Sequence, residues 1–273
     1  MKSSLPSPYT KVYQLPEGMD CDAEVVGKIR DLPRRMKIIV RLYWWWKWVH
    51  ARSQGIHLFN GVIYSAEPQF DWAKKKIKFL LYETTFAHLV ARWLSVGDTR
   101  VVPDFEKFVT CPVLLVTKPT ETEEKCFIFG LINSNRLNGS SINFVGGTMD
   151  KKHTAHSHPL EANFMDESEE EVGILPEHVE HWTFKYLAET EVAYFLVPEV
   201  HLKLTSTQMD EHFQRFTERD TEKEITKIIK VPATQEGVLD FIHRNKNKLT
   251  RPMVEVLLVA VGLEKPSVIT NAA

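Results

Sequence analysis

The sequence predicts an α/β protein in which a mixed sheet packs between helices. Three observations lead to this class: the 273 residues can bury a large core, apolar strand-like runs recur, and helical segments alternate with them in the second half. A composition of 43% hydrophobic and 26% charged residues is typical of globular proteins. We expect a smaller α+β module at residues 1–104 and the main domain at residues 105–273.

The N-terminal module is expected to begin irregularly, because residues 1–20 contain three prolines. Residues 22–52 favour a helix that is broken near Pro33. The rest of the module predicts a pair of strands, a short helix and a connection to the main domain, at residues 58–67, 76–85, 86–94 and 98–105.

The main domain alternates strand-like and helix-like segments. Its strands are expected at residues 111–119, 125–133, 142–150, 181–189, 191–200 and 224–232. Its helices are expected at residues 160–172, 206–218, 236–246 and 251–261. This mixture predicts helices on a mixed sheet.

Charge and cysteine content limit the functional classes. A formal net charge of −2 gives no electrostatic reason to expect nucleic acid as a partner. The most apolar run is interrupted by Arg41 and Lys47, so that we expect neither a membrane-spanning segment nor a membrane partner. Three cysteines without a C-x-x-C spacing argue against a disulfide framework. We expect an intracellular protein, of the cytosol or of an organelle matrix.

An acidic stretch, FMDESEEEVGI, occupies residues 164–174. At 100° per residue, Glu167, Glu170 and Glu171 share a helical arc of about 100°. Such neighbouring carboxylates repel one another, and they crowd the end of a helix that disfavours negative charge. Mg²⁺ prefers oxygen ligands and is often shared with phosphates, so that it would stabilise this arrangement.

Two interpretations of the acidic stretch remain open, a solvated surface and a metal site. The upstream sequence VGGTMD favours the metal site, because Gly146 and Gly147 permit close approach of the backbone to a ligand. The chain thus offers a strand, a double glycine, a loop and an acidic helix in succession.

These residues resemble the motif of the Nudix hydrolases, G-x5-E-x7-R-E-U-x-E-E-x-G-U, in which U is a bulky aliphatic residue. The alignment is anchored on Gly173 and Ile174. The resemblance implies an α/β/α Nudix sandwich at residues 105–273 and Mg²⁺ as cofactor, with Mn²⁺ as a substitute. It assigns metal binding and catalysis to Glu167, Glu170 and Glu171, and contact with substrate phosphates to Gly146, Gly147 and Thr148.

The chain departs from that motif at several positions. The segment that ends at Gly173 is five residues longer than the motif permits. Asp166 replaces the family's arginine, and Ser168 replaces an aliphatic residue. The early glutamate of the motif is matched by His153 without a gap, or by Glu161 if the insertion precedes it.

A narrower resemblance covers residues 40–232 and concerns the UDP-glucose-hydrolysing Nudix proteins of eukaryotes. It rests on a Trp-containing helix, on LFNG and KIKFLL strands, and on a divergent motif after the double glycine. It implies Mg²⁺-dependent cleavage of a nucleoside diphosphate sugar such as UDP-glucose into a nucleoside monophosphate and a sugar phosphate. The alternative is a Nudix-fold subunit with reduced catalysis that serves as a binding or assembly component.

Further residues are candidates by position. A general base is sought among the three glutamates and in a later loop that holds Glu222 and Glu224. Contacts to the base and the sugar are expected partly from the N-terminal module, at Phe59, Asn60 and Arg92.

Two conspicuous sequences have simpler interpretations. WWWKW, residues 44–48, is expected to wedge a helix against the sheet or another domain, and a protein partner is the alternative. HTAHSH, residues 153–158, is expected to be a mobile polar loop rather than a transition-metal site, because it lacks a rigid frame.

Overall fold

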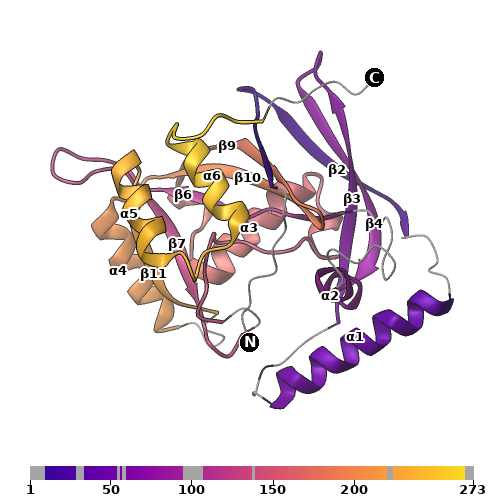
Figure 1. Cartoon of the computed structure of the whole chain (residues 1–273). Helices are drawn as coiled ribbons and strands as arrows, with labels where there is room; N and C mark the ends of the chain where they lie inside the picture. The colour runs from indigo at the N-terminus through magenta and orange to yellow at the C-terminus, as the bar shows by residue number, and fades with distance from the viewer. Residues whose placement is uncertain are drawn as a thin grey trace.

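The computed structural model describes residues 10–28, 34–53, 56, 60–94, 107–136, 139–219 and 224–267. Within these ranges, a mixed sheet of 11 strands is accompanied by six α-helices (Figure 1). The predicted α/β class and mixed sheet are confirmed, while the assignment to the Nudix fold stays a prediction.

The N-terminal elements are β1 (Lys11–Gln14), β2 (Asp20–Lys28), α1 (Arg34–Ser53), β3 (Val62–Asp71), β4 (Lys76–Thr85) and α2 (Phe86–Leu94). The next strands are β5 (Lys107–Thr110), β6 (Leu114–Val116), β7 (Cys126–Ile132) and β8 (Ile142–Asn143). They are followed by α3 (Pro159–Val172), β9 (Val179–Glu189), β10 (Ala193–Leu202) and α4 (Ser206–Thr217). The chain then forms β11 (Ile225–Pro232), α5 (Gln235–Asn245) and α6 (Arg251–Ala260).

Helices cover both faces of the sheet. Successive strand residues point to opposite faces, and β7 illustrates the result. Ile128 belongs to the buried cluster that contains Phe164 of α3 and Met209 of α4. Its neighbour Phe129 instead belongs to the cluster of α5 and α6, and stacks on Phe241 with ring centroids 5.3 Å apart. The sheet is therefore the middle layer of three.

The sheet forks along one side of β10. Residues Ala193–Phe195 pair in parallel with β5, and Glu199–His201 pair in parallel with β6. From β5 the sheet continues through β3 and β4 to β2, whereas from β6 it continues through β7 to β11. The two branches separate between Thr110 and Leu114.

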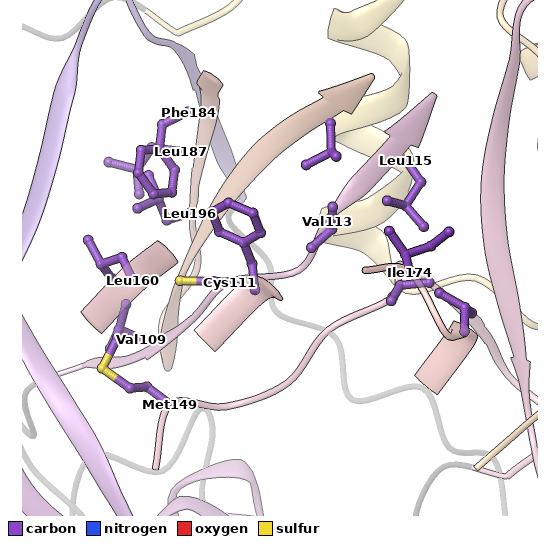
Figure 2. Packing of buried hydrophobic residues seen from close by; sticks show 14 of the residues in the cluster. Val109, Cys111, Val113, Leu115, Met149, Leu160, Ile174, Phe184, Leu187 and Leu196 are labelled. Atoms are coloured by element: carbon purple, nitrogen blue, oxygen red, sulfur yellow. The ribbon is translucent and has the colours of Figure 1, made fainter. Parts of the chain in front are cut away.

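A single extended segment crosses this fork. Isolated bridges join Val145 to Val113, Thr148 to Thr110 and Asp150 to Ile63. Figure 2 shows the buried layer nearby, in which Met149 lies with Val109, Cys111 and Leu160. The double glycine at residues 146–147 therefore lies at the point where the sheet divides.

The N-terminal strands share this sheet with the rest of the chain. Strand β3 pairs with β5 at Ser65 and Ala66, and β1 pairs with β9. The predicted module boundary between residues 104 and 105 lies outside the described residues.

Several predicted elements hold, and others differ. The strand pair β3–β4 and the helices α2 to α6 lie within a few residues of the predicted ranges. The strand predicted at residues 142–150 is a strand only at Ile142–Asn143, with isolated bridges beyond it. Residues 22–28, however, belong to strand β2 instead of the predicted helix, and Lys11–Gln14 is a strand instead of irregular chain. Strand β2 pairs in parallel with β4, where Lys76 lies 3.2 Å from Asp20 and Lys78 contacts Glu24. These cross-strand partners outweigh the local preference for a helix.

The structure also bears on the state of the cysteines and on the apolar character of the helices. The described cysteines Cys21, Cys111 and Cys126 are free thiols, as their spacing predicted. Among the residues that the structure places, no helix combines the length and the apolar character that a membrane crossing requires.

Candidate metal and phosphate site

Helix α3 is held by its apolar face and ended by a glycine. Leu160, Phe164 and Val172 are buried against the sheet, as the spacing of an amphipathic helix requires. Gly173 adopts a left-handed conformation with φ 73°, and its amide donates to the carbonyl of Glu169 at 2.9 Å. This C-terminal cap fixes the direction of the last turn, which carries the predicted glutamates.

The same glycine cannot be replaced without strain. A Cβ atom at Gly173 would lie 2.6 Å from the ring of Phe216. Its carbonyl oxygen lies 2.8 Å from Nε2 of His212 on α4. Helix α3 is thereby tied to α4 at the end nearest the fork.

The double glycine allows the backbone and two carboxyl groups to meet. Gly146 has φ 127°, which favours glycine, and a Cβ atom there would lie 2.7 Å from the carbonyl oxygen of Cys111. A Cβ atom at Gly147 would lie 2.6 Å from both carboxyl oxygens of Glu167. No side chain other than hydrogen fits between the Gly147 backbone and Glu167.

Glu171 lies on the neighbouring turn of α3 and contacts the same backbone. Its Oε2 accepts a hydrogen bond from the amide of Gly146 at 2.8 Å, and the residue is 7% exposed. Burial raises the pKa of Glu171 well above its usual range, although this hydrogen bond opposes the shift. The charges of Glu167 and Glu224 raise the pKa further.

Glu167 is also held toward its protonated form. Burial, followed by the charge of Glu170, raises the pKa of Glu167 to about 8, while Lys152 acts in the opposite direction. Two carboxyl groups therefore lie beside the glycines without a cation sufficient to offset their burial.

Glu170 is not brought to the glycines. It is exposed on the outer side of the last turn, and its Oε1 lies 2.5 Å from Nζ of Lys152. Lys152 also lies 3.8 Å from Asp166. In the part of the chain that the structure describes, no group of three or more His, Cys, Asp or Glu residues is placed to hold a metal ion.

Lys152 was missed by the sequence analysis. The alignment shows only that Asp166 stands where the family has an arginine. In space, the cation beside this helix comes from the loop instead, at Lys152. Lys152 and Glu170 are 18 residues apart, and no sequence pattern links residues at that spacing. Their contact is visible only in the folded structure.

The loop of residues 153–158 differs from the prediction at its first residue. His153 is buried, whereas His156 and His158 are exposed. The Nδ1 atom of His153 lies 3.1 Å from the amide nitrogen of Asp150 and 3.3 Å from Nδ2 of Asn163 on α3. The prediction of a mobile polar loop is therefore wrong for His153, because this ring packs between the loop and α3.

His153 also faces the residue that replaces the family's arginine. Its Nε2 lies 3.5 Å from a carboxylate oxygen of Asp166. Burial lowers the pKa of His153, and the negative charge of Asp150 opposes the shift. The ring therefore accepts the amide hydrogen of Asp150 at Nδ1 and directs its N–H toward Asp166.

The next three candidates, Ser168, Thr148 and Glu161, lie in contacts that belong to the fold itself. Ser168 is buried, and its hydroxyl donates to the carbonyl of Phe164 at 2.7 Å, which satisfies the polar group at the family's aliphatic position. Thr148 lies beside Thr110, whose hydroxyl donates to the carbonyl of Gly147 at 2.7 Å. Glu161 occupies the first turn of α3.

Of the two candidates for the general base in the later loop, only Glu224 is described by the structure. Glu224 lies near enough to the pair for its charge to raise the pKa of both Glu167 and Glu171. One of its carboxylate oxygens lies 3.9 Å from Arg136. Glu222 lies outside the described residues.

In the N-terminal module, Asn60 has a capping role. Its side chain accepts the amide of Ala87 at 2.7 Å, at the start of α2. Phe59 and the side chain of Arg92 lie outside the part of the structure that is described.

The donor set fits a hard divalent cation. The buried carboxyl group of Glu171 and the half-buried one of Glu167 lie beside a strip of backbone that no Cβ atom obstructs, and oxygen ligands are those that Mg²⁺ and Mn²⁺ prefer. Residues Glu167 and Glu171 would hold the ion, and Glu170 would join them after separating from Lys152.

Comparison with known protein families and with curated proteins finds no match for this chain.

Proposed function

We propose that this chain is a Nudix-type hydrolase that uses Mg²⁺, or Mn²⁺ in its place, to cleave the pyrophosphate linkage of a nucleoside diphosphate sugar such as UDP-glucose. The products are a nucleoside monophosphate and a sugar phosphate. One observation carries the proposal: the buried carboxyl group of Glu171 and the half-buried carboxyl group of Glu167 lie against the backbone of Gly146 and Gly147. The choice of sugar nucleotide rests on the sequence resemblance over residues 40–232.

Uncompensated burial is the physical reason to expect a cation here. Glu171 is buried with one backbone hydrogen bond, and Glu167 is half-buried beside it. Removing these two carboxyl groups from water without a neutralising cation costs free energy, which a structural role alone does not explain. A bound divalent cation would reverse both pKa shifts, polarise a phosphoryl oxygen and lower the pKa of a water molecule. The bare backbone at Gly146 and Gly147 leaves room for phosphate oxygens next to these acids.

Proton transfer and charge balance are assigned to neighbouring residues. Glu224 is the candidate proton acceptor, because its charge acts on both Glu167 and Glu171 from the start of β11. Lys152 neutralises Glu170 and Asp166 before the ion is bound, in place of the arginine that the motif would supply.

A second candidate function is a Nudix-like subunit that binds or assembles without catalysis. The observation that favours it is the ion pair between Glu170 and Lys152, which leaves two carboxyl groups rather than three at the glycines. The two candidates differ in whether the chain turns over a pyrophosphate substrate.

Product analysis separates them. The full chain is incubated with UDP-glucose, ADP-ribose or capped RNA in the presence of Mg²⁺ or Mn²⁺, and the products are resolved by chromatography. We expect UMP and glucose 1-phosphate from UDP-glucose. Glu171→Gln should lower kcat by about 100-fold or more, since a metal-ligating carboxylate is lost.

Glu169→Gln is the matched control, because Glu169 is an exposed carboxylate on the same helix and faces away from the glycines. It should retain the activity of the parent. Absence of turnover on all three substrates would favour the assembly subunit, and equal activity of the parent and Glu171→Gln would remove Glu171 from the site.

A further inference from the structure

Helix α1 has two different apolar faces. On the inner face, Val40 is buried against Ala87 and Ala91 of α2. The rings of Trp44 and Phe86 are nearly perpendicular, with centroids 6.3 Å apart. In Figure 1, α2 lies between α1 and the sheet. Trp44 is therefore wedged as predicted, but against helix α2 and not against the sheet, and this packing does not account for the other tryptophans.

The outer face of α1 exposes large apolar side chains in a continuous row. The exposed fractions of these six residues lie between 37% and 62%, and they are Ile38, Leu42, Trp45, Trp46, Trp48 and Val49. At 100° per residue they fall within an arc of about 160° that runs along about three helical turns. A row of this extent on a water-exposed helix indicates a binding surface.

The charges of α1 are all of one sign. Its 20 residues contain no Asp or Glu, and the basic residues are Arg34, Arg35, Lys37, Arg41, Lys47 and Arg52. Arg34, Arg41 and Arg52 are exposed and lie within one side of the apolar row, between the angular positions of Trp48 and Trp45. The guanidinium of Arg52 lies 5.0 Å from the ring centroid of Trp48, so that cationic and aromatic groups share this surface.

We propose that the outer face of α1 attaches the protein to an anionic phospholipid surface. A helix that exposes tryptophan, leucine and basic residues on one surface can lie in the plane of a lipid interface. Indole rings are favoured at the headgroup level, and each basic residue gains from negative lipid charge.

The positive charge of α1 disfavours a second copy of the chain as the partner that binds its outer face. Apposition of two α1 helices by their outer faces would bring exposed arginines of both copies together without any acid on either helix. An anionic bilayer instead complements them.

The charge of the remaining chain favours one orientation. Without the six basic residues of α1, the chain's 34 basic residues fall to 28, against 36 acidic ones. An anionic surface therefore attracts α1 and repels the rest of the molecule. From the sequence we expected no membrane partner, because no segment can span a membrane and the net charge is small. Which apolar residues of α1 stay exposed depends on its packing against α2, which the sequence does not show.

Vesicle co-sedimentation of the full chain tests the proposal. The vesicles consist of phosphatidylcholine alone, or of two parts phosphatidylcholine to one part phosphatidylserine. We expect binding to the second kind only, weakening with salt, together with a blue shift of tryptophan emission. Arg41→Gln with Arg52→Gln should weaken the partition coefficient about 20-fold, because each basic residue contributes about fivefold.

The double variant Leu42→Glu and Trp45→Glu should abolish binding, whereas Leu239→Glu, at an exposed apolar residue of α5, should leave it unchanged. Circular dichroism confirms that each variant is folded. Equal binding to both kinds of vesicle, no binding to either, or unchanged binding by the α1 variants would overturn the proposal. A dimer in light scattering that Leu42→Glu with Trp45→Glu dissociates, without binding to vesicles, would identify the face as an interface between copies.

Discussion

Glu167 and Glu171 show what a sequence can and cannot predict about a single residue. Their spacing of four predicted that both side chains lie on one face of a helix, and both face the double glycine. The burial of Glu171 and the partial burial of Glu167 could not be predicted, because both depend on the path of residues 145–150 across the fork of the sheet. Glu170 has the same residue type and satisfies the same motif, yet it turns to Lys152.

The raised pKa of Glu167 predicts a pH dependence of stability. A carboxyl group whose folded-state pKa is raised stabilises the fold below its unfolded-state pKa, and this stabilisation is lost as the pH rises through about 8. The metal-free protein should therefore have a lower free energy of unfolding at pH 8 than at pH 5, by roughly 1–4 kcal/mol.

Urea denaturation at several pH values measures this difference. Glu167→Gln should flatten the pH profile, and Glu169→Gln should not change it. A profile of equal slope in the parent and in Glu167→Gln would show that Glu167 titrates normally.

Gly147→Ala tests the close approach of backbone and carboxyl group. The new Cβ atom would lie 2.6 Å from the carboxyl oxygens of Glu167 and would displace them. We expect Mn²⁺ affinity, measured by calorimetry, to fall by about tenfold or more, since each coordinating or orienting group matters on this scale.

Gly27→Ala is the control, because nothing lies within 4 Å of the Cβ atom that it would add on β2. This variant should bind Mn²⁺ as the parent does. An undiminished affinity in Gly147→Ala would mean that Glu167 is not a ligand.

At the scale of single elements, α3 was predicted almost to its ends. The expected range, residues 160–172, differs by one residue from Pro159–Val172. Its apolar spacing and the glycine at its end are local signals, which a sequence displays directly. Strand β2 was misassigned because its partner β4 lies about 55 residues away along the chain, and cross-strand pairing decided its conformation.

Lys152→Met tests the link between the loop and α3. Removal of the ammonium group frees Glu170 from the contact at 2.5 Å and eliminates a cation that competes with Mg²⁺. We expect the Mg²⁺ concentration for half-maximal activity to fall several-fold, because a competing charge near the surface contributes about 1 kcal/mol.

Lys151→Met, at the exposed neighbouring residue, should behave as the parent. A higher Mg²⁺ requirement in Lys152→Met would show that Lys152 holds α3 in its working position instead of competing with the ion.

At the scale of the whole molecule, the class was predictable and the topology was not. Alternating strands and helices predicted a mixed sheet covered by helices, since each apolar strand face needs a partner layer. The fork between β5 and β6 arises at Cys111 and Pro112, at the start of the strand that was predicted at residues 111–119, and β5 lies just before that range. No local pattern reveals that two such adjacent segments lead to different branches.

The shared sheet predicts that residues 105–273 do not fold stably alone. Without the N-terminal strands, β5 loses β3, and β9 loses β1, so that two strand edges are exposed. We expect this fragment to aggregate or to show poorly dispersed amide resonances, in contrast to the full chain. A well-dispersed, cooperatively unfolding fragment would support the division into two independent modules.

The central claim is that a divalent cation binds beside the double glycine. Anomalous diffraction from a crystal soaked in Mn²⁺ tests it most directly. We expect a peak about 2.0–2.3 Å from carboxyl oxygens of both Glu167 and Glu171. A peak elsewhere, or none at saturating Mn²⁺, would contradict the claim.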